Sequence, residues 1–144
     1  MGDVSESAAT AARDLRVMFS RLRRRLLEVA TADDLTPSQT AVLIRLIKDG
    51  PASTSQLAGA ERVRPQSMAT TLTGLDRHGL IVRTPDPEDG RRQQIALTDL
   101  GRTHAEKDRT VREEWLARAI QDRYSEAERR VINEALTLLE RLND

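Results

Sequence analysis

The sequence predicts a mainly α-helical fold that carries one small β-hairpin. Three observations indicate this fold class: apolar residues recur at helical spacing over most of the chain, capping residues mark several helix starts, and two short extended segments flank one turn-rich stretch. The chain has 144 residues, which fits one domain with a substantial core. We therefore expect a single domain over residues 1–144.

Composition narrows the function classes. The 23 basic and 23 acidic residues leave no net charge, so a nucleic-acid surface must come from local asymmetry. The absence of cysteine excludes disulfides, thiolate zinc sites and thiol redox switches. The first residues lack the pattern of a signal peptide, and no apolar run is long enough to span a membrane. We expect a cytoplasmic protein.

The N-terminal half is predicted to form four helices. Residues 8–30 place apolar side chains on one face and arginines on the rest, which indicates either a solvated face or contact with DNA phosphates or a partner. Thr36, Pro37 and Gln39 open the helix of residues 35–50 with a capping box, and Gly50 ends it. A short helix within 52–63 and another over 64–79 have the outline of a helix-turn-helix.

A β-hairpin and two more helices complete the prediction. Strands at 80–84 and 93–97 enclose a loop rich in Pro, Asp and Gly, and a helix-turn-helix followed by such a hairpin is a winged helix. Thr98 is expected to cap a long helix with an inner face of Leu100, Val111, Trp115 and Ala119. The helix within 124–144, opened by a Ser125–Glu128 capping box, has an apolar stripe wider than one neighbour needs, which suggests a second chain.

The helix over 64–78 carries the candidate recognition surface. The face opposite Met68, Leu72 and Leu75 is predicted to carry Gln66, Thr70, Thr73, Gly74 and Arg77, with Ser67 and Thr71 toward its flank. Small hydrogen-bonding side chains suit a helix in the DNA major groove, where Gln can pair with adenine and a Thr methyl can meet thymine. The alternative is an ordinary solvent-facing helix surface.

The hairpin tip over 85–93 is the candidate wing. Arg91 and Arg92 stand where a wing reaches the phosphate backbone or the minor groove. We expect Asp89 to brace the Arg91 guanidinium by a bidentate pair, Asp86 to form the turn, and Glu88 to face outward or pair with an arginine. A solvated charged hairpin is the alternative.

These motifs resemble the MarR family of winged-helix transcription regulators. The resemblance spans nearly the whole chain and is most specific in "LDRHGLIVR" and in "DPEDGRRQQIALTDLG", where Glu88 replaces an arginine usual in the family. It implies a lobe over residues 32–98 that binds double-stranded DNA, dimerisation helices at 8–31 and 99–144, and a homodimer reading a palindromic operator in major grooves about 34 Å apart. It further implies release by a small phenolic or other anionic effector.

We assign roles within this resemblance as expectations. Bases would be read by Gln66, Ser67, Thr70, Thr71 and Thr73; phosphates would be bound by Arg62, Arg64, Arg77 and Arg92; and Arg91 would enter or line the minor groove. His104 and Asp108 are spaced as a helix-face pair. An effector site using His104, Arg16 and Arg112 is the alternative for this pair.

No catalytic motif is present, so we expect neither an enzyme nor a bound metal or cofactor. We expect a repressor of nearby genes. The alternative is a winged-helix module that binds proteins and no operator. Arg91 discriminates the two, because only a DNA-binding protein depends on it.

Overall fold

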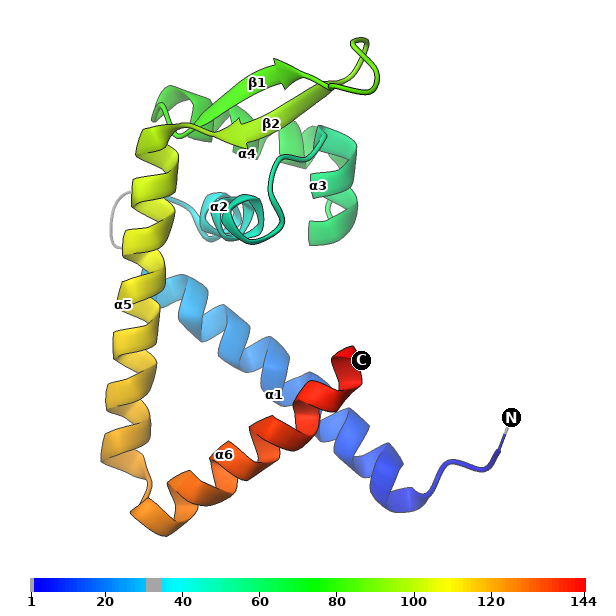
Figure 1. Ribbon diagram of the computed structural model, residues 1–144, viewed down its shortest axis with the longest axis vertical. Coiled ribbons are helices and arrows are strands. Elements are labelled where there is room, and N and C mark those ends of the chain that lie inside the picture. The colour runs from blue at the N-terminus through cyan, green and yellow to red at the C-terminus, as the bar shows by residue number, and fades with distance from the viewer. Residues whose placement is uncertain (1, 31–34) are drawn as a thin grey trace.

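The computed structural model describes residues 2–30 and 35–144. The described residues form six α-helices, one hairpin and a terminal 3-10 turn, in the predicted order. Their bounds are α1 (Glu6–Ala30), α2 (Pro37–Asp49), α3 (Thr54–Glu61), α4 (Pro65–Arg77), β1 (Ile81–Pro85), β2 (Gln93–Leu97), α5 (Asp99–Arg123), α6 (Glu126–Glu140) and η1 (Arg141–Asn143). In Figure 1, α2, α3, α4 and the hairpin form a lobe at one end, and α5 leads from it to α6.

Side-chain caps fix where the helices begin. Thr36 and Ser125 open α2 and α6 with the predicted capping boxes, and Ser53 opens α3 with a third, which was not predicted. Thr98 caps α5 as expected, because its hydroxyl accepts a hydrogen bond from the Gly101 N–H at 3.0 Å. Each such cap satisfies backbone N–H groups that the first helical turn leaves without partners.

The lobe is organised around one apolar core. Leu43 of α2, Leu57 of α3, Leu72 and Leu75 of α4, and Ile95 of β2 are all almost completely buried. Burial of each such side chain contributes about 1.5–3 kcal/mol to folding. Helix α4 is therefore held from behind by α2, by α3 and by the hairpin.

The hairpin is antiparallel, with Ile81 opposite Leu97 and Pro85 opposite Gln93. Its first strand begins at Ile81, one residue later than predicted, because Leu80 belongs to the turn that follows α4. The Leu80 N–H donates to the Leu75 carbonyl at 3.1 Å across Gly79, which has a positive φ of 69°. Ala52 pairs with Ile95 as an additional bridge and ties the hairpin to the start of α3.

The inner face of α5 differs from the prediction. Leu100 and Val111 are 58% and 38% exposed in the chain, so their placement on the inner face was wrong. The buried positions of α5 are Gly101, Ala105 and Asp108. The buried face therefore begins one residue after the predicted one, because the small Gly101 and Ala105 allow closer packing. Trp115 and Ala119 are half-buried.

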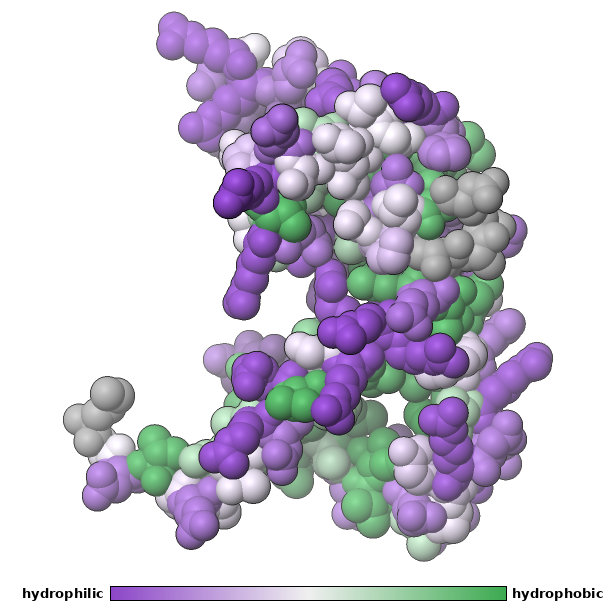
Figure 2. All heavy atoms as spheres, turned by 180° about the vertical axis from the view of Figure 1, so that it is seen from behind, coloured by the Kyte–Doolittle hydropathy of each residue, from purple (hydrophilic) through white to green (hydrophobic). Residues whose placement is uncertain are grey.

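At the other end of the molecule, α6 has no buried residue. Its exposed apolar side chains include Val131, Leu136 and Leu138. Figure 2 shows green, apolar atoms gathered among the lower helices, whereas the wing end is covered by purple, hydrophilic side chains. The chain therefore leaves an apolar surface uncovered far from the lobe.

Candidate nucleic-acid interface and adjoining pocket

The outer face of α4 is a row of exposed polar side chains. Gln66, Thr70, Thr73 and Arg77 are exposed, while Met68, Leu72 and Leu75 point into the core. Helical spacing places the four polar residues along one side. The structure thus brings together most of the residues predicted to face DNA.

Gly74 is an exception to the predicted face. It is half-buried, and a Cβ there would overlap the Gln39 side-chain amide of α2. Its placement on the outer face was therefore wrong. The physical reason is that Gly74 lies against the Gln39 side chain at the N-terminus of α2, and that side chain would have to move for any larger residue.

The threonine hydroxyls of α4 bond to their own helix. Oγ1 of Thr70 donates to the Gln66 carbonyl at 3.2 Å, Oγ1 of Thr71 to the Ser67 carbonyl at 3.1 Å, and Oγ1 of Thr73 to the Ala69 carbonyl at 2.9 Å. Such bonds fix χ1 of each threonine. Ser67 and Thr71 lie on the flank, where they line a hollow of about 270 Å³ shared with α1 and α2.

The turn into α4 presents two arginines. Arg62 ends α3 in the left-handed region, at φ 54°, and Pro65 occupies the first turn of α4. Arg62 and Arg64 are both exposed, and Arg64, the N-cap of α4, makes no side-chain cap bond. Positive side chains at a helix N-terminus, whose own N–H groups favour anions, suit a phosphate.

The wing is shaped by two aspartates. Asp86 accepts the Glu88 N–H at 2.9 Å, which confirms its predicted role as a turn former. Asp89 accepts the backbone N–H of Arg91 at 3.1 Å, so the predicted bracing of the Arg91 guanidinium was wrong. A carboxylate two residues before an amide readily closes such a turn, whereas holding a long exposed side chain costs rotamer entropy.

The wing arginines consequently extend into solvent. Arg91 and Arg92 are exposed, and neither guanidinium has an ion-pair partner among the described residues. Glu88 is exposed and likewise lacks an ion pair within the described chain, which matches the outward-facing alternative. Figure 1 shows the hairpin loop projecting beyond α3, away from α5. The wing therefore offers two free positive charges at its tip.

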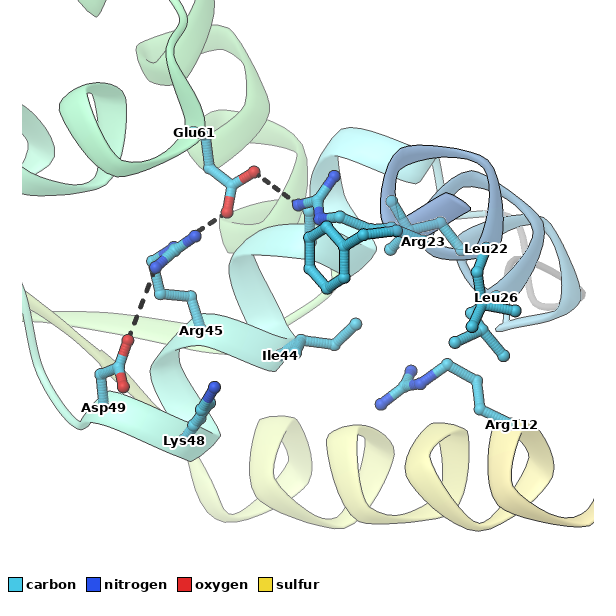
Figure 3. Close-up of a pocket in the computed structure, with 12 residues that line it drawn as sticks. Leu22, Arg23, Leu26, Ile44, Arg45, Lys48, Asp49, Glu61 and Arg112 are labelled. Carbon is cyan, nitrogen blue, oxygen red and sulfur yellow. Dashed lines mark hydrogen bonds and ion pairs between the residues drawn. The ribbon is translucent and has the colours of Figure 1, made fainter. Parts of the chain in front are cut away.

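Behind this interface lies a pocket of about 330 Å³ between α1, α2 and α5. Figure 3 shows Leu22, Leu26 and Ile44 on its apolar side and the Glu61 carboxylate between two arginines on the other. The Glu61 side chain is 11% exposed and accepts bonds from Arg23 and Arg45, each at 2.9 Å. Because Glu61 is the last residue of α3, these ion pairs join the pocket wall to the helix-turn-helix.

Arg112 enters the same pocket from α5 (Figure 3). Its Nη1 is buried without a hydrogen-bond partner among the described residues. Burial lowers the pKa of Arg112, and the nearby carboxylates of Asp108 and Glu113 oppose that shift. A cationic donor facing an apolar wall is suited to an anionic ligand.

The other predicted effector residues lie elsewhere. His104 Nε2 is 3.4 Å from Asp108 Oδ2, which confirms the predicted pair on one helix face. Neither His104 nor the exposed Arg16 lines the pocket. Of the three, the structure places only Arg112 in this pocket.

The ion-pair network of Arg23, Arg45 and Glu61 was not predicted from the sequence. These pairs join residues 38 and 16 positions apart, and no local spacing marks a contact of that kind. The only available signal was the arginine-rich face of the first helix. Within residues 2–30 and 35–144, no cluster of three His, Asp or Glu side chains is placed to hold a metal.

Comparison with known proteins distinguishes the hypothesis of a DNA-binding regulator from that of a protein-binding module. The MarR family profile matches residues 35–92. An HTH-type transcriptional regulator of Mycobacterium tuberculosis is 32% identical over 139 residues, covering 96% of each chain. A crystal structure of a transcriptional regulator protein from Pseudomonas aeruginosa is 36% identical, with a TM-score of 0.80 and 97% of each chain covered.

The chain belongs to the MarR family. A MarR family protein from Bacillus stearothermophilus shares the fold, with a TM-score of 0.72 at 22% identity over 97% of each chain. As a MarR protein, the chain is a DNA-binding regulator of transcription and not an enzyme. The family does not support the alternative of a module that binds only proteins. No helix in the described part of the chain is long and apolar enough to cross a membrane.

Proposed function

We propose that this MarR protein is a homodimeric repressor that binds a palindromic operator. The observation that carries the proposal is the exposed polar row of α4, backed by a buried core and placed beside a wing with two unpaired arginines. The role of repressor is supported by similarity to MdtR of Bacillus subtilis, an HTH-type transcriptional repressor. The two sequences are 31% identical over 87 residues, which cover 60% of this chain and 56% of MdtR.

The proposed contacts follow from exposure and chemistry. Gln66, Ser67, Thr70, Thr71 and Thr73 face the bases, with Ser67 and Thr71 at the edge of the contact. Arg62, Arg64, Arg77 and Arg92 bind phosphates, Asp89 holds the wing turn, and Arg91 reaches the minor groove.

The dimer is proposed from the uncovered apolar surface. A groove of about 700 Å³ between α1, α5 and α6 is lined by Met18, Trp115, Leu116 and Leu136, among others. Closing it with a second copy would remove these side chains from water. We therefore divide the chain into a DNA-binding lobe over 32–98 and dimerisation helices at 8–31 and 99–144; the boundary near residue 32 lies outside the described residues.

Selection from a random-sequence duplex pool tests the operator proposal. We expect enrichment of an inverted repeat whose half-sites are one helical turn apart, bound by two chains. Failure to enrich any motif at low salt would contradict operator binding. A single, unpaired half-site would contradict the dimeric arrangement.

A paired substitution tests the dimer separately. Leu136→Asp with Leu139→Asp places two carboxylates on the apolar surface of α6, and we expect monomers of reduced stability by sedimentation. Thr137→Asp, on the same helix and also exposed, is the matched control and should leave the dimer intact. A well-folded dimer of the Leu136/Leu139 variant would refute this interface.

We propose in addition that the pocket between α1, α2 and α5 receives a small aromatic or other anionic effector. The Arg112 guanidinium, with one buried nitrogen unpartnered, would bind the anion, and the apolar wall would hold the rest. Release of DNA requires that the ligand bind more tightly to a lobe arrangement that does not fit the operator. Glu61 is the connection, because its ion pairs link this pocket to the turn before α4.

Calorimetric titration with sodium benzoate tests the pocket. We expect saturable binding that is lost in Arg112→Met and kept in Arg118→Met, an exposed arginine further along α5. Benzoate should also weaken operator binding by the unsubstituted protein. Equal binding by both variants would rule out Arg112 as the anion site.

A further inference from the structure

We propose that Thr70 and Thr73 select A·T base pairs in each half-site, because their methyl groups contact the thymine methyl. This inference rests on the proposed operator binding and adds the composition of the site. It concerns the middle of the exposed face of α4, where both side chains project away from the core.

The decisive observation is where the hydroxyl protons go. Thr70 donates to the Gln66 carbonyl and Thr73 to the Ala69 carbonyl, at 3.2 and 2.9 Å. A hydroxyl has a single proton, so neither threonine has a proton left for DNA. Donating to DNA instead would require breaking this bond.

Thr70 and Thr73 can therefore offer DNA only a methyl group and the lone pairs of the hydroxyl oxygen. Phosphate oxygens and the acceptor atoms of the bases find no donor here. A·T and G·C pairs each display one amino donor in the major groove, on adenine or on cytosine, so the hydroxyl lone pairs do not distinguish them. The thymine methyl belongs to A·T pairs alone, and it is the group that a threonine methyl can contact.

On this face of the described helix, the side chains that can donate are Gln66, with Ser67 beside it on the flank, and Arg77 at the other end. Gln66 lies one turn before Thr70, and Arg77 lies one turn after Thr73, and both are exposed. Those residues can serve guanine or adenine acceptors at the edges of the half-site. The central base pairs, opposite Thr70 and Thr73, are therefore expected to be A·T.

The test replaces thymine by uracil in the duplex obtained by random-sequence selection. Uracil lacks only the C5 methyl, so we expect each central substitution to weaken binding about fourfold, the equivalent of one buried methyl group. Uracil in the spacer between half-sites is the control and should have no effect. Selection of G·C pairs at the centre, or equal affinity for the uracil duplex, would overturn the inference.

Protein variants make the test specific to these side chains. Thr73→Val keeps the methyl group and should retain the uracil penalty at both central thymines, whereas Thr73→Ser loses the methyl and should abolish it at one of them. Persistence of the full penalty at both positions in Thr73→Ser would overturn the contact by Thr73. These outcomes are separable from failure of the proposed function, because a selected motif of any composition establishes operator binding, and no motif at all refutes it.

Discussion

Replacing Gly101 by alanine should destabilise the protein, although alanine is the better helix former. Gly101 lies in the first turn of α5, where the lobe joins the long helix. A Cβ at this position would overlap the Leu80 carbonyl oxygen and lie 2.9 Å from its carbonyl carbon and 3.2 Å from its Cα. These atoms are backbone, so the clash cannot be relieved by turning a side chain.

The size of the destabilisation depends on which atoms must move to make room for the new Cβ. Overpacking of this kind costs about 1–3 kcal/mol. Shifting α5 also strains the Thr98 N–H bond to the Leu80 carbonyl, now 3.1 Å, at a cost of about 1 kcal/mol. The higher helix propensity of alanine returns about 1 kcal/mol. The free energy of unfolding should therefore fall by about 2 kcal/mol, and the melting temperature by roughly 4–8 °C.

Gly59→Ala is the matched control. Gly59 is also helical, in α3, but an added Cβ there would have nothing within 4 Å. The same chemical change should thus stabilise the protein by about 0.5–1 kcal/mol. Urea unfolding followed by circular dichroism measures both variants. Two shifts of the same sign would refute the packing account of the α5 junction.

Three further predictions concern function and pH. Arg91→Ala should weaken operator binding by about 1–3 kcal/mol without changing the unfolding midpoint, while Arg118→Ala should change neither; equal losses would argue against the wing contact. Arg62→Gly should stabilise the fold by about 1 kcal/mol, since it removes a non-glycine residue from the left-handed region. It should also reduce the dependence of DNA affinity on salt concentration; an unchanged dependence would exclude a phosphate contact by Arg62. Hydrogen bonds from the backbone and then the side chain of Ser125 lower the pKa of Glu128. The resulting stabilisation of α6 is present above the ordinary carboxyl pKa and is lost as pH falls through the lowered one. Ser125→Ala should raise that pKa in an NMR titration, and an unaltered value would contradict the cap.

The sequence was sufficient wherever local chemistry determines the structure. Thr36, Thr98 and Ser125 were identified as caps because a cap depends on residues within one helical turn. Met68, Leu72 and Leu75 were assigned to the buried side of α4 because their spacing follows the helical period. The polar face opposite them followed from the same pattern.

Prediction failed where tertiary packing decides. Leu100 and Val111 were placed inward by apolar character, but Gly101 lets α5 approach the hairpin on a face turned by one residue. Gly74 faces α2 for a similar reason. The Glu61 network could not be seen, because ion pairs between distant helices leave no periodic trace in the sequence.

Helical phasing of the operator tests the central claim most directly. If two α4 helices of one dimer enter successive major grooves on one side of the duplex, inserting about 5 base pairs between the half-sites rotates one of them to the opposite face. Binding measured by titration should then collapse to the half-site level. Affinity that is unaffected by this insertion would contradict a dimer reading both half-sites at once.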